Sequence, residues 1–322
     1  MPELRRAIAE WYQRRFDVVL DPEKEVLPLI GSKEGIAHMP LALINPGDTV
    51  LIPDPGYPPY RSGTLFAEGI PYLMPLLEEN GFLPDLGSIG SKILSRAKMM
   101  FLNYPNNPTA ACAPKSFFEE MARFADKHGI LICHDAAYTE IAFDGFRPMS
   151  FLEVKGSKEV GIEFHSLSKT FNMTGWRIGF AVGNSEAISF LAKVKSNIDS
   201  GIFQAVQYAG VKALREGDLE TQKNIRIYEE RRDLFVNGFR KLGWKLDPPK
   251  ATFYIWISVP PGYTSQEISL KFLKEAQLVV TPGNGFGSHG EGYFRVAITV
   301  PKERICEALE RIKRMSHQVA KK

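Results

Sequence analysis

The sequence predicts an α/β fold: an open, mostly parallel (mixed) sheet with helices on both faces, followed by a smaller α+β C-terminal domain. Three observations predict it. Between residues 26 and 182, short apolar runs alternate with helical stretches, which is typical of buried strands with helices between them. Polar motifs follow these runs directly, at the strand ends where open α/β sheets bind ligands. A long charged stretch then leads into a second, smaller group of strands.

The first part of the chain has one leading helix and six expected strands. Residues 2–16 are expected to be an amphipathic helix, because Leu4, Ile8 and Trp11 recur at helical spacing and Pro2 suits a first turn. Six apolar runs are the expected strands of the large sheet: Val26–Ile30, Thr49–Ile52, Met99–Leu102, Ile130–Cys133, Ile162–His165 and Ile178–Val182.

The second part begins with a connecting helix. Residues 218–242 are charged and carry no turn signal before Gly238, which predicts one long helix. Beyond it, the sequence predicts three strands and a closing helix: Thr252–Val259, Leu278–Thr281, Tyr293–Thr299 and residues 302–317. We therefore expect a large domain of residues 1–217, then a connecting helix and small domain of residues 218–322.

Composition excludes several classes of protein. The 40 basic and 37 acidic residues leave a net charge of only +3, which argues against a nucleic-acid or membrane surface. No apolar run approaches the roughly 20 residues of a membrane span, and the first residues lack the apolar core of a signal peptide. Three scattered cysteines read as reduced thiols. Six histidines without ligand spacing predict no metal site. The expected compartment is the cytoplasm.

Lys169 lies in the run Ser166-Leu-Ser-Lys169-Thr-Phe-Asn-Met-Thr-Gly-Trp-Arg177. Taken alone, a lysine near serines and an arginine is usually part of a solvated loop. Gly31-Ser32-Lys33-Glu-Gly follows a strand and opens a helix, an arrangement that suits phosphate but also any helix start. Arg177 suits the same anion, with a surface salt bridge as the ordinary alternative.

Two polar residues follow expected strands. Asp135 ends an apolar strand, where a carboxylate is costly without a partner; the alternative is the N-cap of a following helix. Asn107 lies in Asn-Asn-Pro-Thr, which also suits a simple turn. His134 and His165 each precede a candidate site residue and should point to the opposite sheet face.

Three further features are candidates for binding. Tyr57, in Pro-Gly-Tyr-Pro, is held in a rigid turn and would either stack on a ligand or lie in the core. Arg295 is a charge within an apolar strand, so it needs a substrate carboxylate or a structural acid. The glycine-rich loop (residues 281–292) precedes a strand, so it is no dinucleotide fingerprint, but it could close over a substrate.

Along nearly its whole length the chain resembles the class I/II aminotransferases of pyridoxal-phosphate fold type I, because eight pieces occur in the family's order. The resemblance implies that Lys169 forms a Schiff base with the cofactor and acts as general base and acid. It implies that the remaining cofactor contacts come from Ser32, Lys33, Tyr57, Asn107, Asp135, Tyr138, Ser166 and Arg177. Arg295, with Asn107, would bind the substrate carboxylate, and Asp135 would pair with the ring nitrogen.

Within that family the chain is most similar to LL-diaminopimelate and aspartate-type aminotransferases. This implies an amino-acid donor (LL-diaminopimelate, aspartate or alanine), a 2-oxo acid acceptor and a homodimer. Two departures are visible: Ala110 replaces the glycine usual after Asn-Pro-Thr, and the family's N-terminal segment before Pro2 is lacking. A carbon–sulfur β-lyase of the same fold and a cofactor-binding chain with impaired turnover therefore stay as alternatives.

Overall fold

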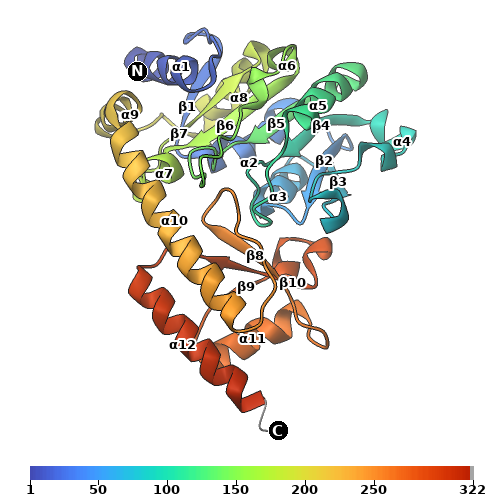
Figure 1. Ribbon diagram of the computed structural model, residues 1–322. Helices are drawn as coiled ribbons and strands as arrows, with labels where there is room; N and C mark the ends of the chain where they lie inside the picture. Colours follow the sequence, from blue (N-terminus) through green and yellow to red (C-terminus); the bar gives the residue numbers. More distant parts are fainter. Residues whose placement is uncertain (320–322) are drawn as a thin grey trace.

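The computed structural model describes residues 1–319 of the chain. It has a large part and a smaller part, joined along one side by the long helix α10 (Asp218–Lys241) (Figure 1). The N-terminus lies in the large part, and the last helix, α12 (Lys302–Val319), belongs to the small part. The predicted leading helix is confirmed as α1 (Pro2–Phe16), and the predicted connecting helix is α10. No helix within residues 1–319 is long and apolar enough to cross a membrane.

The large part is built on a seven-stranded sheet in the order β1-β7-β6-β5-β4-β2-β3. Its strands are β1 (Val26–Leu29), β2 (Thr49–Asp54), β3 (Ile70–Pro75), β4 (Ala97–Leu102), β5 (Leu131–Asp135), β6 (Gly161–Ser166) and β7 (Gly179–Gly183). Neighbouring strands are parallel except at β7, which is antiparallel to both β1 and β6. The predicted mixed, mostly parallel sheet is confirmed. The sequence did not predict β3, a partly exposed edge strand that carries prolines at positions 71 and 75, where proline disfavours a strand assignment.

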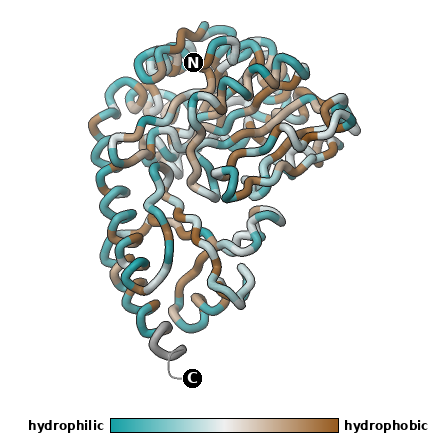
Figure 2. Tube along the Cα trace, turned by 45° about the vertical axis from the view of Figure 1, so that its right-hand side comes forward, coloured by the Kyte–Doolittle hydropathy of each residue, from teal (hydrophilic) through white to brown (hydrophobic). Residues whose placement is uncertain are grey.

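Helices cover both faces of this sheet. One face packs against α1, α5 (Lys115–His128) and α9 (Gln204–Glu216); the other packs against α2 (Ser32–Leu43), α3 (Pro58–Phe66) and α8 (Ser185–Ile198). Because side chains alternate along a strand, Met100 of β4 contributes to the first core and Met99 to the second. Figure 2 shows the hydrophobic strands enclosed between largely hydrophilic helices. Three short helices complete this part: α4 (Ser91–Leu94), α6 (Ser157–Val160) and α7 (Leu167–Thr170).

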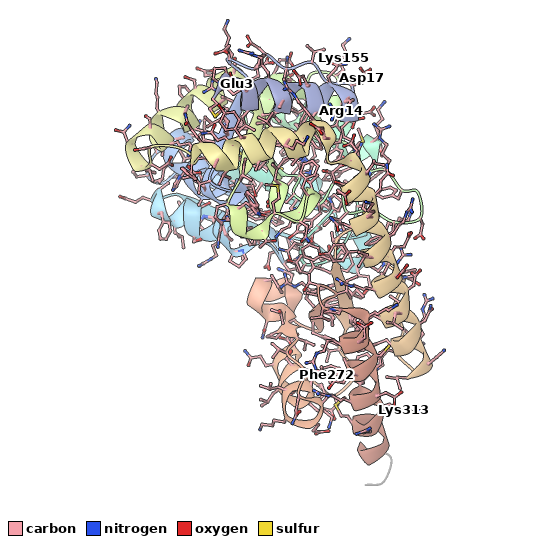
Figure 3. All side chains as sticks on the ribbon, turned by 90° about the vertical axis from the view of Figure 1, so that its left-hand side faces the viewer. Glu3, Arg14, Asp17, Lys155, Phe272 and Lys313 are labelled. Atoms are coloured by element: carbon pink, nitrogen blue, oxygen red, sulfur yellow. The ribbon has the colours of Figure 1, made fainter. Side chains whose placement is uncertain are left out.

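The small part contains a three-stranded antiparallel sheet in the order β8-β10-β9. Its elements are β8 (Tyr254–Ser258), α11 (Ser265–Ala276), β9 (Thr281–Pro282), β10 (Tyr293–Ala297) and α12 (Lys302–Val319). The expected strand at residues 278–281 is reduced to the two residues of β9. Phe272 of α11 is fully buried in this part, whereas Lys313 of α12 is exposed (Figure 3).

The two parts also share packing. The apolar core of the small part includes Tyr138 and Phe143, which follow β5 of the large part. Gly238 lets α10 approach α12 closely, because a Cβ at this position would lie 2.3 Å from Leu309 Cδ1. The division of the chain at residues 217 and 218 coincides with the start of α10 and stays a prediction as a domain boundary.

One edge of the large sheet gathers the polar motifs. The parallel strands β1, β4, β5 and β6 all run toward this carboxyl edge, where Ser32, Asn103, Asp135 and Ser166 lie at or just beyond their ends. The antiparallel strand β7 starts at the same edge, because Gly179 pairs with Ser166. Residues that precede β7 therefore meet residues that follow the parallel strands.

Candidate active site

A cavity of about 580 Å³ lies between the carboxyl edge and the small part. All ten candidate residues of the sequence line it: Ser32, Lys33, Tyr57, Asn107, Asp135, Tyr138, Ser166, Lys169, Arg177 and Arg295. A larger groove of about 870 Å³, between residues 109–114 and 245–250, contains none of them. The structure thus brings every candidate into one cavity.

Asp135 forms a buried carboxylate in this cavity. Its Oδ2 accepts a hydrogen bond from the hydroxyl of Tyr60 (2.9 Å), and its backbone carbonyl accepts one from Asn103 Nδ2 (2.7 Å). Its Oδ1 is buried without a partner among the described residues. Burial raises the pKa of Asp135 to about 6, although the Tyr60 hydroxyl, His134, the nearby backbone amide of Ala137 and the charge of Lys169 act against this rise. The chain after Asp135 forms turns and no helix, so the N-cap alternative is wrong.

Lys169 is the third residue of α7 and is partly buried. Its Nζ lies 5.6 Å from the centroid of the Phe253 ring. Burial lowers the pKa of the Lys169 amine; the Asp135 carboxylate opposes this shift, and the positive charge of Arg177 adds to it. A lysine in this setting is more readily available as a neutral amine than an exposed one.

An anion-binding corner lies at the other end of the cavity. Ser32 starts α2 after Gly31, which has φ 76° and makes no side-chain cap, so the first backbone N–H groups of α2 are available to a ligand. The Arg177 guanidinium packs so closely on Gly31 that a Cβ there would lie 2.2 Å from Nη2. Ser166 ends β6 beside them. Arg177 appears in none of the ion pairs within residues 1–319, so the salt-bridge alternative is wrong.

Three tyrosines line the middle of the cavity. Tyr57 caps α3 and is half-buried; burial, with the nearby Asp135 charge, raises its pKa to about 12. Lys33 Nζ lies 5.8 Å from the centroid of this ring. The hydroxyl of Tyr138 donates to that of Tyr254 (3.3 Å), and burial raises the pKa of Tyr138 well above its ordinary value.

Arg295 lies on the face of the small sheet that points into the cavity. Its Nη1 donates to Asn107 Oδ1 (2.6 Å), and its guanidinium lies between two rings, 4.0 Å from the Tyr254 centroid and 4.6 Å from that of Phe286. No ion pair of the described residues includes Arg295, and its Nε has no partner. The structural-acid alternative for Arg295 is therefore wrong. Asn107 is more than a turn residue, because its side chain joins the two parts.

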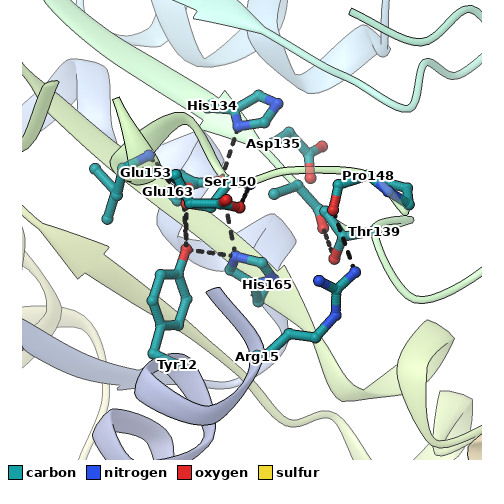
Figure 4. A network of polar contacts seen from close by, with 12 residues as sticks. Tyr12, Arg15, His134, Asp135, Thr139, Pro148, Ser150, Glu153, Glu163 and His165 are labelled. Atoms are coloured by element: carbon teal, nitrogen blue, oxygen red, sulfur yellow. Dashed lines mark hydrogen bonds and ion pairs between the residues drawn. The ribbon is translucent and has the colours of Figure 1, made fainter. Parts of the chain in front are cut away.

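A second polar network lies behind the sheet, away from the cavity (Figure 4). Glu163 is fully buried and binds His134 Nδ1 (2.8 Å) and the hydroxyl of Tyr12 (2.8 Å), which also contacts His165 Nε2 (2.9 Å). Burial would raise the pKa of Glu163, but His134, His165 and Ser150 outweigh it and lower this pKa to about 2. Burial lowers the pKa of His165 to about 4. Both histidines occupy the opposite face, as predicted.

Sequence reasoning missed four residues that line or support the cavity. These are Tyr60, which holds Asp135, the aromatic residues Tyr254 and Phe286 beside Arg295, and Ser168, whose buried Oγ has no hydrogen-bond partner in the part of the chain that the structure describes. Tyr60 carried one signal, since it follows Tyr57 by three residues and so shares its side of a helix. Tyr254 and Phe286 lie in segments that were predicted only as strand and loop.

The fold and cavity define a class of enzyme, and comparison with known proteins identifies it. The profile of the family described as aminotransferase class I and II matches residues 1–312. The chain belongs to this family and is an aminotransferase. It is 57% identical over 313 residues to the LL-diaminopimelate aminotransferase of Desulforudis audaxviator, a match that covers 97% of this chain and 80% of that protein. The enzyme of the same name from Moorella thermoacetica is 57% identical over 318 residues, covering 98% and 81%.

Solved structures agree with this assignment. Apo-BacF from Bacillus subtilis superposes with a TM-score of 0.95 at 43% identity, covering 98% of this chain and 84% of that chain. An aromatic aminotransferase from Pyrococcus horikoshii gives a TM-score of 0.93 at 31% identity, covering 99% and 87%. The expected family and fold are thereby confirmed.

Proposed function

We propose that this chain binds pyridoxal 5'-phosphate in the cavity and transfers an amino group from an amino acid to a 2-oxo acid. One observation carries the proposal. Asp135, a buried carboxylate with an unpartnered Oδ1, lines the same cavity as the pKa-lowered amine of Lys169. Class I and II aminotransferases depend on this cofactor, whose ring stores the electrons released when a bond to the substrate Cα breaks.

The residues present fit the cofactor. The ring nitrogen of pyridoxal phosphate, when protonated, is a cation and a donor, which is what Asp135 Oδ1 lacks. Such a partner would pull the pKa of Asp135 down and keep it ionised. The phosphate would lie at the start of α2, between Ser32, Lys33, Ser166 and Arg177.

Three side chains would hold the ring itself. Tyr57 would stack on it, and Asn107 would donate a hydrogen bond to its phenolic oxygen. Tyr138 would donate a second one by turning its hydroxyl hydrogen away from Tyr254. The Asn107 Oδ1 already accepts from Arg295, so its amide nitrogen is the donor that remains. Asn107 thereby links the cofactor end of the cavity to the residue proposed for the substrate carboxylate.

Lys169 would carry out the proton transfers. Its Nζ would hold the cofactor covalently, and in the presence of an amino-acid donor the same Nζ would be a free amine beside the substrate. Burial lowers the Lys169 pKa, which favours the neutral Nζ needed to take a proton from the substrate Cα. The flexible side chain of Lys169 would let the same Nζ hold this proton and release it at a neighbouring position, so one residue would act first as base and then as acid.

Arg295 would bind the α-carboxylate of both substrates. Its guanidinium has an unpartnered Nε and no acidic partner among the described residues, so an anion with two oxygens is well matched. Burial lowers the pKa of Arg295, because removing the charged guanidinium from water costs free energy. A substrate carboxylate would offset that cost.

The names of the relatives support LL-diaminopimelate as the donor. We also propose a homodimer, because Phe203 and Tyr208, at the start of α9, are 75% and 60% exposed. Sedimentation velocity tests this point, and a monomer at micromolar concentration would contradict it. A cytoplasmic location agrees with the three free cysteines among the described residues.

A half-reaction screen tests the function. The cofactor-loaded protein is mixed with LL-diaminopimelate, aspartate, alanine or a cysteine derivative, and the visible spectrum is recorded. We expect a donor-dependent spectral change, largest with LL-diaminopimelate, that a 2-oxo acid reverses. Release of pyruvate and ammonia from the cysteine derivative would indicate a β-lyase instead. Lys169→Ala should abolish the change, and a spectrum that no amino acid alters would refute amino transfer.

A further inference from the structure

The glycine-rich loop of the small part is held on the large part by one buried carboxylate. Asp54, the last residue of β2, is only 1% exposed. It accepts hydrogen bonds from Ser288 Oγ (2.7 Å) and from His289 Nδ1 (2.7 Å), since a carboxylate can only accept. Close by, Gly56 N donates to the carbonyl of Phe286 (2.9 Å). These contacts join segments at least 230 residues apart in the chain.

The loop backbone lies directly on this carboxylate. Gly287, between Phe286 and Ser288, has φ 139°, a conformation that side chains rarely adopt. A Cβ at Gly287 would lie 1.7 Å from Asp54 Oδ1, so no larger residue fits without breaking the contact. We call this close contact of Asp54 with Gly287, Ser288 and His289 the joint between the two parts.

This joint sets the position of Phe286. The Phe286 backbone is held by Gly56 on one side and by the Asp54 contacts on the other. Its ring packs on the Arg295 guanidinium, opposite Tyr254. Loss of the joint would free one of the two rings that restrain Arg295, while Asp135, Lys169 and the anion-binding corner would keep their contacts.

We propose that Asp54 is a positioning residue for the substrate carboxylate, acting through Ser288 and His289 to hold Phe286 against Arg295. The inference rests on the proposed function, because it takes Arg295 as the carboxylate site. It makes a selective claim: weakening the joint impairs binding of molecules that carry the carboxylate and leaves the chemistry at the cofactor unchanged. Both the amino acid and the 2-oxo acid should then show raised KM values with kcat little changed.

Two nucleophiles of different shape test the claim. Hydroxylamine and aminooxyacetate attack the same carbon of the bound cofactor, but only aminooxyacetate carries a carboxylate. In His289→Leu, we expect the aminooxyacetate rate to fall about tenfold relative to the hydroxylamine rate, the effect of losing one charged hydrogen bond. His289→Asn keeps a donor near the Nδ1 position and should recover most of the loss. Asp54→Asn should act like His289→Leu.

Tyr293→Phe is the matched control. It removes the hydrogen bond from the Tyr293 hydroxyl to Glu78 (2.7 Å), which also crosses between the parts but does not hold the glycine-rich loop. In Tyr293→Phe, the ratio of the aminooxyacetate rate to the hydroxylamine rate should equal that of the wild type. An unchanged ratio in His289→Leu, or an equal fall in both rates, would overturn the proposal.

Hydrogen exchange distinguishes a failure of the joint from a failure of the proposed function. In the cofactor-free protein, residues 283–292 should exchange faster in His289→Leu than in the wild type. If residues 283–292 exchange at the same rate in His289→Leu and in the wild type, the joint is contradicted, whatever the catalytic activity of the enzyme. If exchange quickens but the loaded wild type reacts with neither nucleophile, the proposed function fails. The carboxylate role then falls with it.

Discussion

Replacing Asp135 with asparagine should raise the free energy of unfolding of the cofactor-free protein, compared with the wild type, progressively as the pH rises. Burial raises the pKa of this carboxyl from its ordinary 3.8 to about 6 in the folded state. A group with a raised folded pKa contributes its full stability below the unfolded pKa and loses it as the pH rises through the folded pKa. Above pH 6 the ionised Asp135 is therefore a net cost, which asparagine does not carry.

The size of the effect follows from the shift. The rise of the Asp135 pKa from 3.8 to about 6 corresponds to about 3 kcal/mol of destabilisation once the carboxyl is fully ionised. Between about pH 4.5 and pH 8, the free energy of unfolding of Asp135→Asn relative to wild type should thus rise by about 2 kcal/mol. Asparagine leaves an amide group without a partner, at a cost of about 1–3 kcal/mol. That cost does not depend on pH and cancels in the comparison.

Urea unfolding at the two pH values measures the effect. The cofactor-free wild type, Asp135→Asn and the control Asp126→Asn, which alters an exposed carboxyl, are compared. A stability difference that stays constant with pH, or that moves against the variant as pH rises, would refute the reasoning. In the loaded enzyme the same replacement should lower kcat by about a hundredfold, because a neutral amide cannot balance a positive ring nitrogen. Single-turnover kinetics with LL-diaminopimelate would show this loss.

Three further changes have definite expected outcomes. Arg177→Lys should weaken cofactor binding about tenfold, because a lysine lacks the planar fork of the guanidinium; equilibrium dialysis measures it, and an equal Kd would count against the phosphate role. The Glu163 pKa of about 2 stabilises the folded protein above pH 4.5, and this stability is lost as the pH falls through 2. Glu163→Gln should therefore lower the free energy of unfolding by about 3 kcal/mol near neutral pH. Urea unfolding should show the two proteins converging in acid. Ala110→Gly should raise stability by about 0.5–1 kcal/mol, because Ala110 has φ 60°, and an unchanged melting curve would argue against strain there.

The departure at Ala110 illustrates how sequence and structure inform each other. The resemblance to the family marked Ala110 only as a departure from an expected glycine. The structure supplies the reason for glycine, since this position takes a left-handed conformation that costs alanine free energy. The loop keeps its shape because Ala110 N donates to the carbonyl of Asn106 (3.0 Å).

Partners of the candidate residues were less predictable than the residues themselves. Asp135 and Arg295 stood out because a charge at the end of an apolar strand or within one is costly and needs a reason, whereas Lys169 stood out through the resemblance to the family. Tyr60, Tyr254 and Phe286 are aromatic residues in ordinary positions, and nothing local separates them from core residues. Their contacts with Asp135 and Arg295 depend on how distant segments pack.

Local sequence was sufficient for six of the seven strands of the large sheet, for the long connecting helix and for marking the candidate residues, because periodicity, charge and turn residues act over a few positions. Tertiary packing alone determined which of these residues meet. Because β7 is antiparallel to β1 and β6, Arg177, which precedes β7, lies beside Gly31, which follows β1, and Ser166, which ends β6. Asp54 likewise reaches Ser288 and His289 only when the small part folds against the sheet. Strand order and joints of this kind depend on burial shared between segments hundreds of residues apart, and no local pattern encodes them.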